Sequence, residues 1–211
     1  MLTSIPNLLT LSRIASIPLI VVTFYLEGPL GNWLGLIILI FAGATDFFDG
    51  YLARAMHQQS SLGKFLDPIA DKLLISSLIL MLVGSGGIPG ISILPAVVIL
   101  CRELLVSGLR EFLAGAQVSV PVSRMAKYKT TLQMVTLGFL MVGPAGPNFG
   151  NFTTTDIGIF GLWIAALLTL ITGYDYLRAG LRHVEKLDND IILEKKTIDN
   201  AKKQSRSEYR S

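Results

Sequence analysis

Six long apolar segments, separated by short breaks, follow one another along the chain. They lie near residues 8–26, 33–55, 61–83, 91–114, 123–143 and 156–178. A helix needs about 20 mainly apolar residues to cross a hydrocarbon core of roughly 30 Å, and each segment is long enough to do so. The breaks after the first, third and fifth segments are rich in turn-forming residues. The pattern therefore predicts an all-α integral membrane protein with six transmembrane helices.

The composition supports a membrane protein and excludes several other classes. Of the 211 residues, 51% are hydrophobic and 16% are charged, whereas soluble domains carry charge on about 25% of residues. The mean hydropathy of +0.57 excludes a disordered or fibrous chain. The single cysteine excludes a disulfide framework and a cysteine-built metal site. A formal net charge of only +3 gives no indication of a nucleic-acid partner.

Lysine and arginine are distributed unequally between alternate connections. Three connections contain neither residue: 27–32, 84–90 and 144–155. The other two, together with the segment after the last span, contain several: 54–64, 110–129 and 178–211. Basic residues are retained on the cytoplasmic side of membranes. We therefore expect both termini to be cytoplasmic, with residues 1–182 forming the membrane domain and residues 183–211 forming a polar, flexible cytoplasmic tail.

Four aspartates lie inside apolar segments, where an ionised side chain is costly and requires a partner or a function. Asp46 and Asp49 lie near the inner end of the second segment, and Asp67 and Asp71 near the inner end of the third. Spacings of three and four residues place each pair on one face of its helix. Two antiparallel helices would bring the four acids to two matching levels, roughly 5 Å apart along the helices. The sequence therefore predicts a cage of carboxylate oxygens.

The chemistry of such a cage favours hard divalent cations. Four like charges repel one another unless a cation neutralises them, and ligation by oxygen alone favours Mg²⁺ or Mn²⁺ over Zn²⁺. Four acids suit two ions, a common arrangement for displacement at phosphorus. Gly50 and Gly63 would allow a phosphate to approach the helix backbones, and Arg54 would donate hydrogen bonds to its oxygens. A structural ion-pair network and the ion pathway of a cation transporter are the alternatives.

The same residues form a recognisable pattern, Asp46-x2-Asp49-Gly50-x2-Ala53-Arg54-x8-Gly63-x3-Asp67-x3-Asp71. This pattern resembles the signature of the CDP-alcohol phosphatidyltransferase family at every fixed position. The resemblance implies a homodimer of six-helix membrane chains with a site for two metal ions near the cytoplasmic surface. It also implies transfer of a phosphatidyl group from CDP-diacylglycerol to an alcohol, with release of CMP.

The resemblance also assigns roles to the aspartates. Asp46, Asp49 and Asp67 would be metal ligands, and Asp71 would be both a metal ligand and the general base towards the acceptor hydroxyl. We expect in-line attack on phosphorus without a covalent enzyme intermediate. The two acyl chains would lie in an apolar groove open to membrane lipids.

Basic residues on the cytoplasmic side of the fourth and fifth segments suggest an anionic acceptor, such as a phosphorylated polyol. We assign Arg110, Lys127 and Lys129 to the acceptor phosphate. Anchoring at the membrane interface is the alternative for each of these cations. For Arg102, which lies deeper in its segment, the alternative is an internal pair with an acid.

Three stretches resemble the bacterial members of this family that use glycerol-3-phosphate: 5–13, 102–111 and 127–131. This resemblance implies glycerol-3-phosphate as the acceptor and a bacterial cytoplasmic membrane, with the active site facing the cytoplasm. Asn7, Thr10 and Arg13, near the inner end of the first segment, would then reach the nucleotide or its phosphates. Helix capping is an alternative role for Asn7. Inositol phosphate, serine and phosphatidylglycerol are alternative acceptors for the same chemistry.

Overall fold

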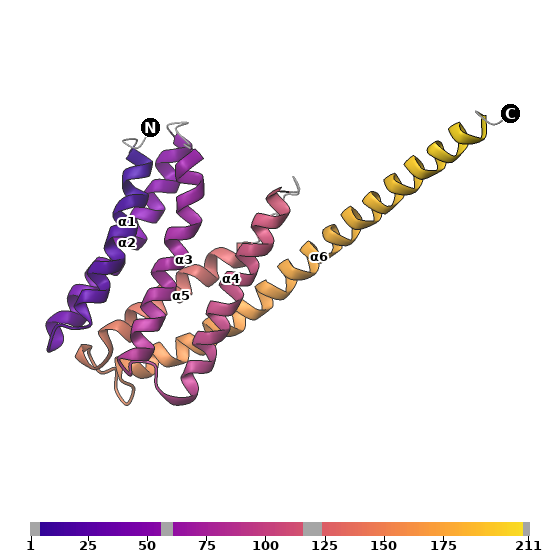
Figure 1. Ribbon diagram of the computed structural model, residues 1–211. Helices are drawn as coiled ribbons and strands as arrows, with labels where there is room; N and C mark the ends of the chain where they lie inside the picture. Colours follow the sequence, from indigo (N-terminus) through magenta and orange to yellow (C-terminus); the bar gives the residue numbers. More distant parts are fainter. Residues whose placement is uncertain (1–4, 56–60, 116–123, 209–211) are drawn as a thin grey trace.

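The computed structural model describes the backbone of residues 5–55, 61–115 and 124–208, and most side chains of these ranges up to Val184. The described chain is helical. Its six α-helices are α1 (Ile5–Thr23), α2 (Pro29–Ala55), α3 (Ser61–Gly84), α4 (Ile93–Gly115), α5 (Arg124–Val142) and α6 (Thr154–Glu208), drawn in Figure 1. Two short 3₁₀ helices, Gly90–Ser92 and Gly143–Ala145, precede α4 and follow α5. The predicted all-α fold class is confirmed.

The helix boundaries follow local signals in the sequence. α2 begins at Pro29, a residue whose fixed φ and missing N–H suit the first turn of a helix. Thr153 and Asp156 form a capping box at the start of α6. The Thr153 backbone N–H donates to Asp156 Oδ2 at 2.9 Å, and the Asp156 N–H donates to Thr153 Oγ1 at 3.1 Å. Five of the six predicted segments match the helices to within four residues at each end, and the sixth matches at its start.

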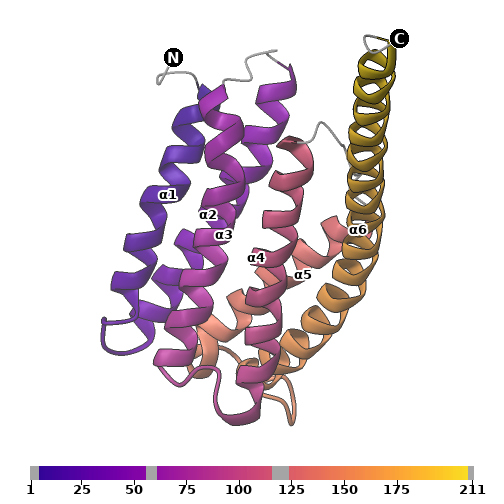
Figure 2. The same ribbon diagram turned by 45° about the vertical axis from the view of Figure 1, so that its right-hand side comes forward.

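The helices pack as two groups of three. α1 packs on α2 and α3, while α6 packs on α4 and α5. Contacts of α2 with α5 and of α3 with α4 and α5 join the groups. Figures 1 and 2 show α1, α2 and α3 side by side, with α5 lying obliquely to them. The buried core draws on both groups and includes Leu39, Leu78, Leu82, Leu137 and Leu162.

Consecutive helices run in opposite directions along the bundle. The start of α1, the end of α2 and the start of α3 lie at one end, drawn at the top of Figure 1. The connections after α1, α3 and α5 lie at the opposite end. These are the connections without Lys or Arg, so the charge asymmetry in the sequence corresponds to the two ends of the fold.

The apolar character of the described helices fits a membrane protein. Three stretches of the searched residues are long and apolar enough to cross a bilayer: Pro29–Asp46, Gly90–Gly115 and Thr154–Val184. A shorter apolar stretch, Asn7–Thr23, lies in α1. Large apolar side chains on several helices point outwards, among them Leu19, Ile37, Leu80 and Phe160. Lipid is a more suitable environment than water for such a surface.

The polar segment after the last apolar stretch continues α6. The helix runs without interruption from Thr154 to Glu208, and its C-terminal part extends beyond the other helices (Figure 1). The boundary predicted between residues 182 and 183 falls inside this helix, and the division of the chain there remains a prediction.

Candidate functional site

Aspartates of α2 and α3 meet a buried arginine of α1. Arg13 Nη2 lies 3.0 Å from Asp46 Oδ1, and Arg13 Nη1 lies 2.8 Å from Asp71 Oδ1 and 4.0 Å from Asp67 Oδ1. The Arg13 side chain is 0% exposed, while the three aspartate side chains are about half exposed. The three aspartates, Asp46, Asp67 and Asp71, are called the acidic cluster below.

A polar stripe on α1 faces the acidic cluster. Asn7, Thr10 and Arg13 follow one another at three-residue intervals, which places them on one side of the helix. Thr10 Oγ1 donates a hydrogen bond of 2.7 Å to Asp67 Oδ1, and Asn7 and Thr10 are buried. One turn further on, the Ser16 hydroxyl donates to the Arg13 carbonyl oxygen at 2.6 Å. α1 therefore supplies hydroxyl and guanidinium donors to acids that α3 and α2 supply.

Asp46 and Asp71 lie at the same level, as the helix spacing predicts. Both carboxylates contact terminal nitrogens of one guanidinium. Asp67 is held beside them by Thr10. Gly63 lies in α3 one turn before Asp67, whereas the side chains of Asp49 and Arg54, and the surroundings of Gly50, are outside the described part of the structure. The roles predicted for these residues stay predictions.

The acidic cluster has the donor chemistry for a hard cation, and Asp49, the fourth acid of the predicted pattern, lies outside the described side chains. Among the described side chains, no three acidic, histidine or cysteine residues lie close enough together to hold one ion. Arg13 lies between Asp46 and Asp71 and takes the position of the positive charge. Carboxylate oxygens converging on a cation from two helices fit Mg²⁺ or Mn²⁺ chemically.

A continuous ion pathway through the bundle finds little support in the described helices. Beyond the acidic cluster, α3 continues with the buried apolar residues Leu74, Leu78 and Leu82. The cation at the centre of the cluster is a side chain of the protein itself, Arg13. These features favour a closed site over the cation transporter raised by the sequence.

A second buried network joins α4, α5 and α6. Glu103 Oε1 contacts Lys129 Nζ and lies 3.4 Å from Arg102 Nη1. Arg102 Nη2 donates to Thr172 Oγ1 at 3.2 Å. The Lys129 side chain is only 4% exposed. The internal acid pair raised as the alternative role for Arg102 is thus present, and the same acid also pairs with Lys129, a contact that the sequence did not indicate.

The other predicted acceptor residues are placed differently. The Arg110 guanidinium is exposed and lies 5.8 Å from the ring centroid of Tyr176, while the side chain of Lys127 is outside the described residues. Lys72, which directly follows Asp71, donates to Ser107 Oγ of α4. Lys72 is a functional candidate that the sequence expectations above do not include, although a lysine beside the aspartate pattern in an apolar segment is itself a signal.

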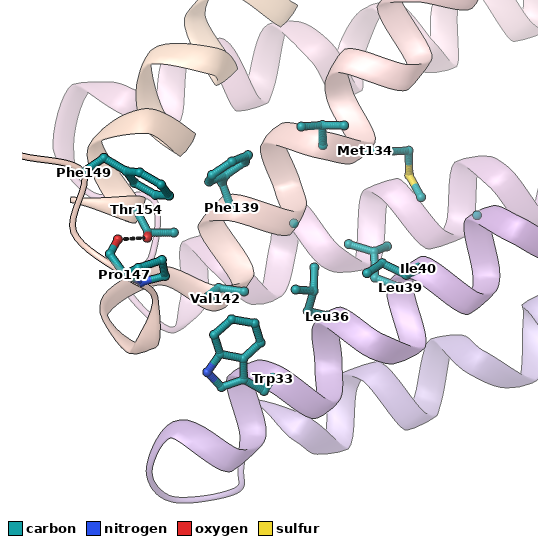
Figure 3. Close-up of a pocket in the computed structure, with 13 residues that line it drawn as sticks. Trp33, Leu36, Leu39, Ile40, Met134, Phe139, Val142, Pro147, Phe149 and Thr154 are labelled. Atoms are coloured by element: carbon teal, nitrogen blue, oxygen red, sulfur yellow. Dashed lines mark hydrogen bonds between the residues drawn. The ribbon is translucent and has the colours of Figure 1, made fainter. Parts of the chain in front are cut away.

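An apolar groove of about 450 Å³ lies between α2 and α5 (Figure 3). Its α2 side is lined by Trp33, Leu36, Leu39, Ile40 and Gly43. Its remaining lining comes from α5, the connection after α5 and the start of α6: Met134, Val135, Gly138, Phe139, Val142, Pro147, Phe149 and Thr154. Figure 3 shows the groove running from Trp33 and Pro147 towards Met134 and Ile40, with Thr154 hydrogen-bonded to the Pro147 carbonyl.

The groove leads along α2 towards the acidic cluster. Leu36, Leu39, Gly43 and Asp46 follow one another on α2 at intervals of three and four residues, so they share one side of the helix. Gly43, at the inner end of the groove, is about 4.5 Å from Asp46 along the helix axis at 1.5 Å per residue. A single stripe of α2 therefore carries both the apolar lining and an acid of the cluster.

Comparison with known proteins places these features in a family. The model of the CDP-alcohol phosphatidyltransferase family matches residues 3–171, which include the whole acidic cluster. A protein of Rickettsia bellii is 51% identical over 176 residues, covering 83% of this chain and 94% of its own. A protein of Pectobacterium atrosepticum is 42% identical over 182 residues (85% and 96%), and one of Cereibacter sphaeroides is 37% identical over 215 residues (86% and 97%). All three are named CDP-diacylglycerol–glycerol-3-phosphate 3-phosphatidyltransferase.

Proposed function

The chain belongs to the CDP-alcohol phosphatidyltransferase family, and we propose that it transfers the phosphatidyl group of CDP-diacylglycerol to glycerol-3-phosphate. The products are phosphatidylglycerol phosphate and CMP. The observation that carries this proposal is the convergence of Asp46, Asp67 and Asp71 on one buried positive charge. The shared name of relatives from three genera supports glycerol-3-phosphate as the acceptor over the other alcohols.

The reaction exchanges one phosphorus–oxygen bond for another. A hydroxyl oxygen of the acceptor attacks the β-phosphorus of CDP-diacylglycerol in line with the leaving group, and the bond to the bridging oxygen of the pyrophosphate breaks. CMP departs with that oxygen. Asp71, whose side chain is 44% exposed, takes the proton of the hydroxyl as the general base. Asp46, Asp49, Asp67 and Asp71 would hold two Mg²⁺ or Mn²⁺ ions, which supply positive charge to the phosphates.

The substrates are assigned to the surroundings of the acidic cluster. The pyrophosphate of CDP-diacylglycerol would lie beside Gly50, Gly63 and Arg54. The nucleotide would lie on the side of Asn7, Thr10 and Arg13 of α1. The phosphate of the acceptor would be attracted by Arg110, Lys127 and Lys129. Lys129 would then interact with both this phosphate and Glu103. One acyl chain of CDP-diacylglycerol would lie in the groove between α2 and α5, because this groove is apolar and leads along α2 towards Asp46.

We assign the chain to a bacterial cytoplasmic membrane, with six spanning helices and both termini in the cytoplasm. The bacterial relatives and the apolar helices support the membrane. The positions of the connections without Lys or Arg support the orientation. The acidic cluster, near the end of α2 and the beginning of α3, would then face the cytoplasm, where CDP-diacylglycerol headgroups and glycerol-3-phosphate meet. A homodimer, implied by the resemblance, is part of this proposal.

An acceptor panel with purified full-length protein in detergent tests the proposal. With CDP-diacylglycerol and Mg²⁺ or Mn²⁺, glycerol-3-phosphate should give product and CMP, whereas inositol phosphate, serine and phosphatidylglycerol should not. A chelator should abolish the reaction. Asp71→Asn should lower the rate by at least about 100-fold, the lower range for a lost general base. Asp156→Asn, in the capping box at the far end of the molecule, should keep the rate within about two-fold of the original.

Two results would contradict the proposal. Product from another alcohol but none from glycerol-3-phosphate would show that the acceptor is wrong. Full activity of Asp71→Asn would show that the reaction does not use the acidic cluster as proposed.

A further inference from the structure

Arg13 lies where a bound cation would lie. We propose that the Arg13 guanidinium is the internal counter-ion of the acidic cluster, which divalent metal ions displace from Asp46 and Asp71 when they bind. This inference rests on the metal-dependent function proposed above. It makes Arg13 a positioning residue, whose first task is to hold the acids in the metal-free protein.

The burial of Arg13 supports this role. A guanidinium that is 0% exposed loses its hydration and must be compensated by acids or other acceptors. Asp46 and Asp71 lie within 3.0 Å of its terminal nitrogens, and Asp67 lies 4.0 Å away. The same contacts serve the carboxylates, which would otherwise repel one another across the interface of α2 and α3. The arginine and the acids therefore stabilise one another in the metal-free protein.

The geometry makes the guanidinium and a metal ion competitors. Mg²⁺ requires oxygen ligands at about 2.0–2.1 Å. An ion at that distance from the Oδ1 atoms of both Asp46 and Asp71 would overlap the space that the Arg13 nitrogens take up, since they contact those two oxygens. Among the described side chains, which do not include that of Asp49, no three acids lie close enough together to hold an ion. Metal binding requires the carboxylates to exchange one cation for another.

Asp67 differs from the other two acids. Thr10 donates to Asp67 Oδ1 at 2.7 Å, a shorter contact than the 4.0 Å to Arg13. Asp67 therefore remains held by α1 when the guanidinium leaves. The exchange is expected to involve Asp46 and Asp71 mainly, with Asp67 as the fixed member of the cluster.

Thermal unfolding and Mn²⁺ binding of full-length protein in detergent test the inference. Arg13→Gln should lower the melting temperature in the presence of a chelator by at least twice as much as in saturating Mn²⁺, because the metal takes over the role of the guanidinium. Mn²⁺ measured by electron paramagnetic resonance should bind Arg13→Gln about 10-fold more tightly than the unchanged protein, since coupling between competing ligands is reciprocal. Arg13→Lys keeps one positive charge but loses the planar fork of donors. It should lower the melting temperature and tighten Mn²⁺ binding as Arg13→Gln does, but by smaller amounts.

Arg102→Gln is the matched control. Arg102 is a largely buried arginine whose described contacts are with Glu103 and Thr172 and not with the acids of the cluster. Its substitution should lower the melting temperature equally with chelator and with Mn²⁺, and should leave Mn²⁺ affinity unchanged.

The outcomes separate this inference from the function on which it rests. Equal losses of melting temperature for Arg13→Gln in chelator and in Mn²⁺, or unchanged or weaker Mn²⁺ binding, would overturn the inference while leaving the metal site intact. If Arg13→Gln does not fold, the same readouts on Arg13→Lys decide. If the unchanged protein binds no Mn²⁺, the metal-dependent function fails and the inference fails with it.

Discussion

Glu103 pairs a single carboxylate with two cations, the buried Lys129 and the largely buried Arg102. Its Oε1 atom contacts Lys129 and lies 3.4 Å from Arg102, so both cations lose their acid if Glu103 is neutralised. Glu103→Gln should cost about 3–5 kcal/mol of folding stability, because it leaves buried charge without compensation. The double variant Glu103→Gln/Lys129→Met should recover part of this loss. Thermal unfolding in detergent measures both, and a double variant less stable than Glu103→Gln alone would contradict the prediction.

The residues of the acidic cluster were predictable from spacing, but their partner was not. Helical periodicity alone places Asp67 and Asp71 on one side of α3, and the aspartate pattern suggests that α2 faces it. The sequence assigned Arg13 to the nucleotide, whereas the structure places it among the acids. That contact joins residues 58 positions apart, Arg13 and Asp71, and it depends on how α1 rotates against α3. Local patterns do not determine such a rotation.

The helices themselves were the most predictable elements. Apolar runs and turn residues predict all six segments. The capping box at Thr153 explains where α6 begins, and the proline at the first position of α2, Pro29, explains where α2 begins. Two features of the helices could not be predicted from the apolar pattern of the sequence. The oblique path of α5 results from its packing between α2 and α6. α6 continues to Glu208 because the polar segment after the last apolar stretch contains helix-forming residues. Hydropathy shows only that this polar segment does not span a membrane.

The groove along α2 makes a prediction about the binding of an acyl chain. A Cβ added at Gly43 would lie 3.4 Å from Met134 Cε, so Gly43→Leu should fill the inner end of the groove. Displacing about two methylenes at about 0.8 kcal/mol each should raise the KM for long-chain CDP-diacylglycerol roughly 10-fold. The KM for a dioctanoyl substrate should rise by a similar factor, because Gly43 lies at the end of the groove beside Asp46 and a short chain reaches it as well.

Gly84→Leu is a suitable control for the groove, since a Cβ at Gly84 meets nothing within 4 Å. It should change neither KM. An unchanged KM of Gly43→Leu for both substrates would show that no acyl chain lies in this groove.

At the scale of the whole molecule, hydropathy and packing give different counts of spanning helices. Composition alone marks three stretches of the described residues as able to cross a membrane. α1 and α5 carry polar residues that lower their hydropathy, but Thr10, Arg13, Lys129 and Gln133 are at most 3% exposed. These side chains point into the bundle, where other polar groups contact them, and so they do not oppose insertion of the assembled fold. Six spanning helices are therefore compatible with the finding that only three stretches of the described residues are long and apolar enough by composition alone.

Labelling of single cysteines tests this topology. In a Cys101→Ser background, an impermeant maleimide should label Glu27→Cys, Ser85→Cys and Asn151→Cys in spheroplasts, because these positions lie in the three connections without Lys or Arg at one end of the bundle. Ser207→Cys should be labelled only after the membrane is opened. A chain with three spans would place at least one of the three connections on the same side as residue 207. If all three positions are labelled from outside and Ser207→Cys is protected, the chain must cross the membrane an even number of times between one connection and the next. It must also cross an odd number of times between the last connection and the C-terminal segment.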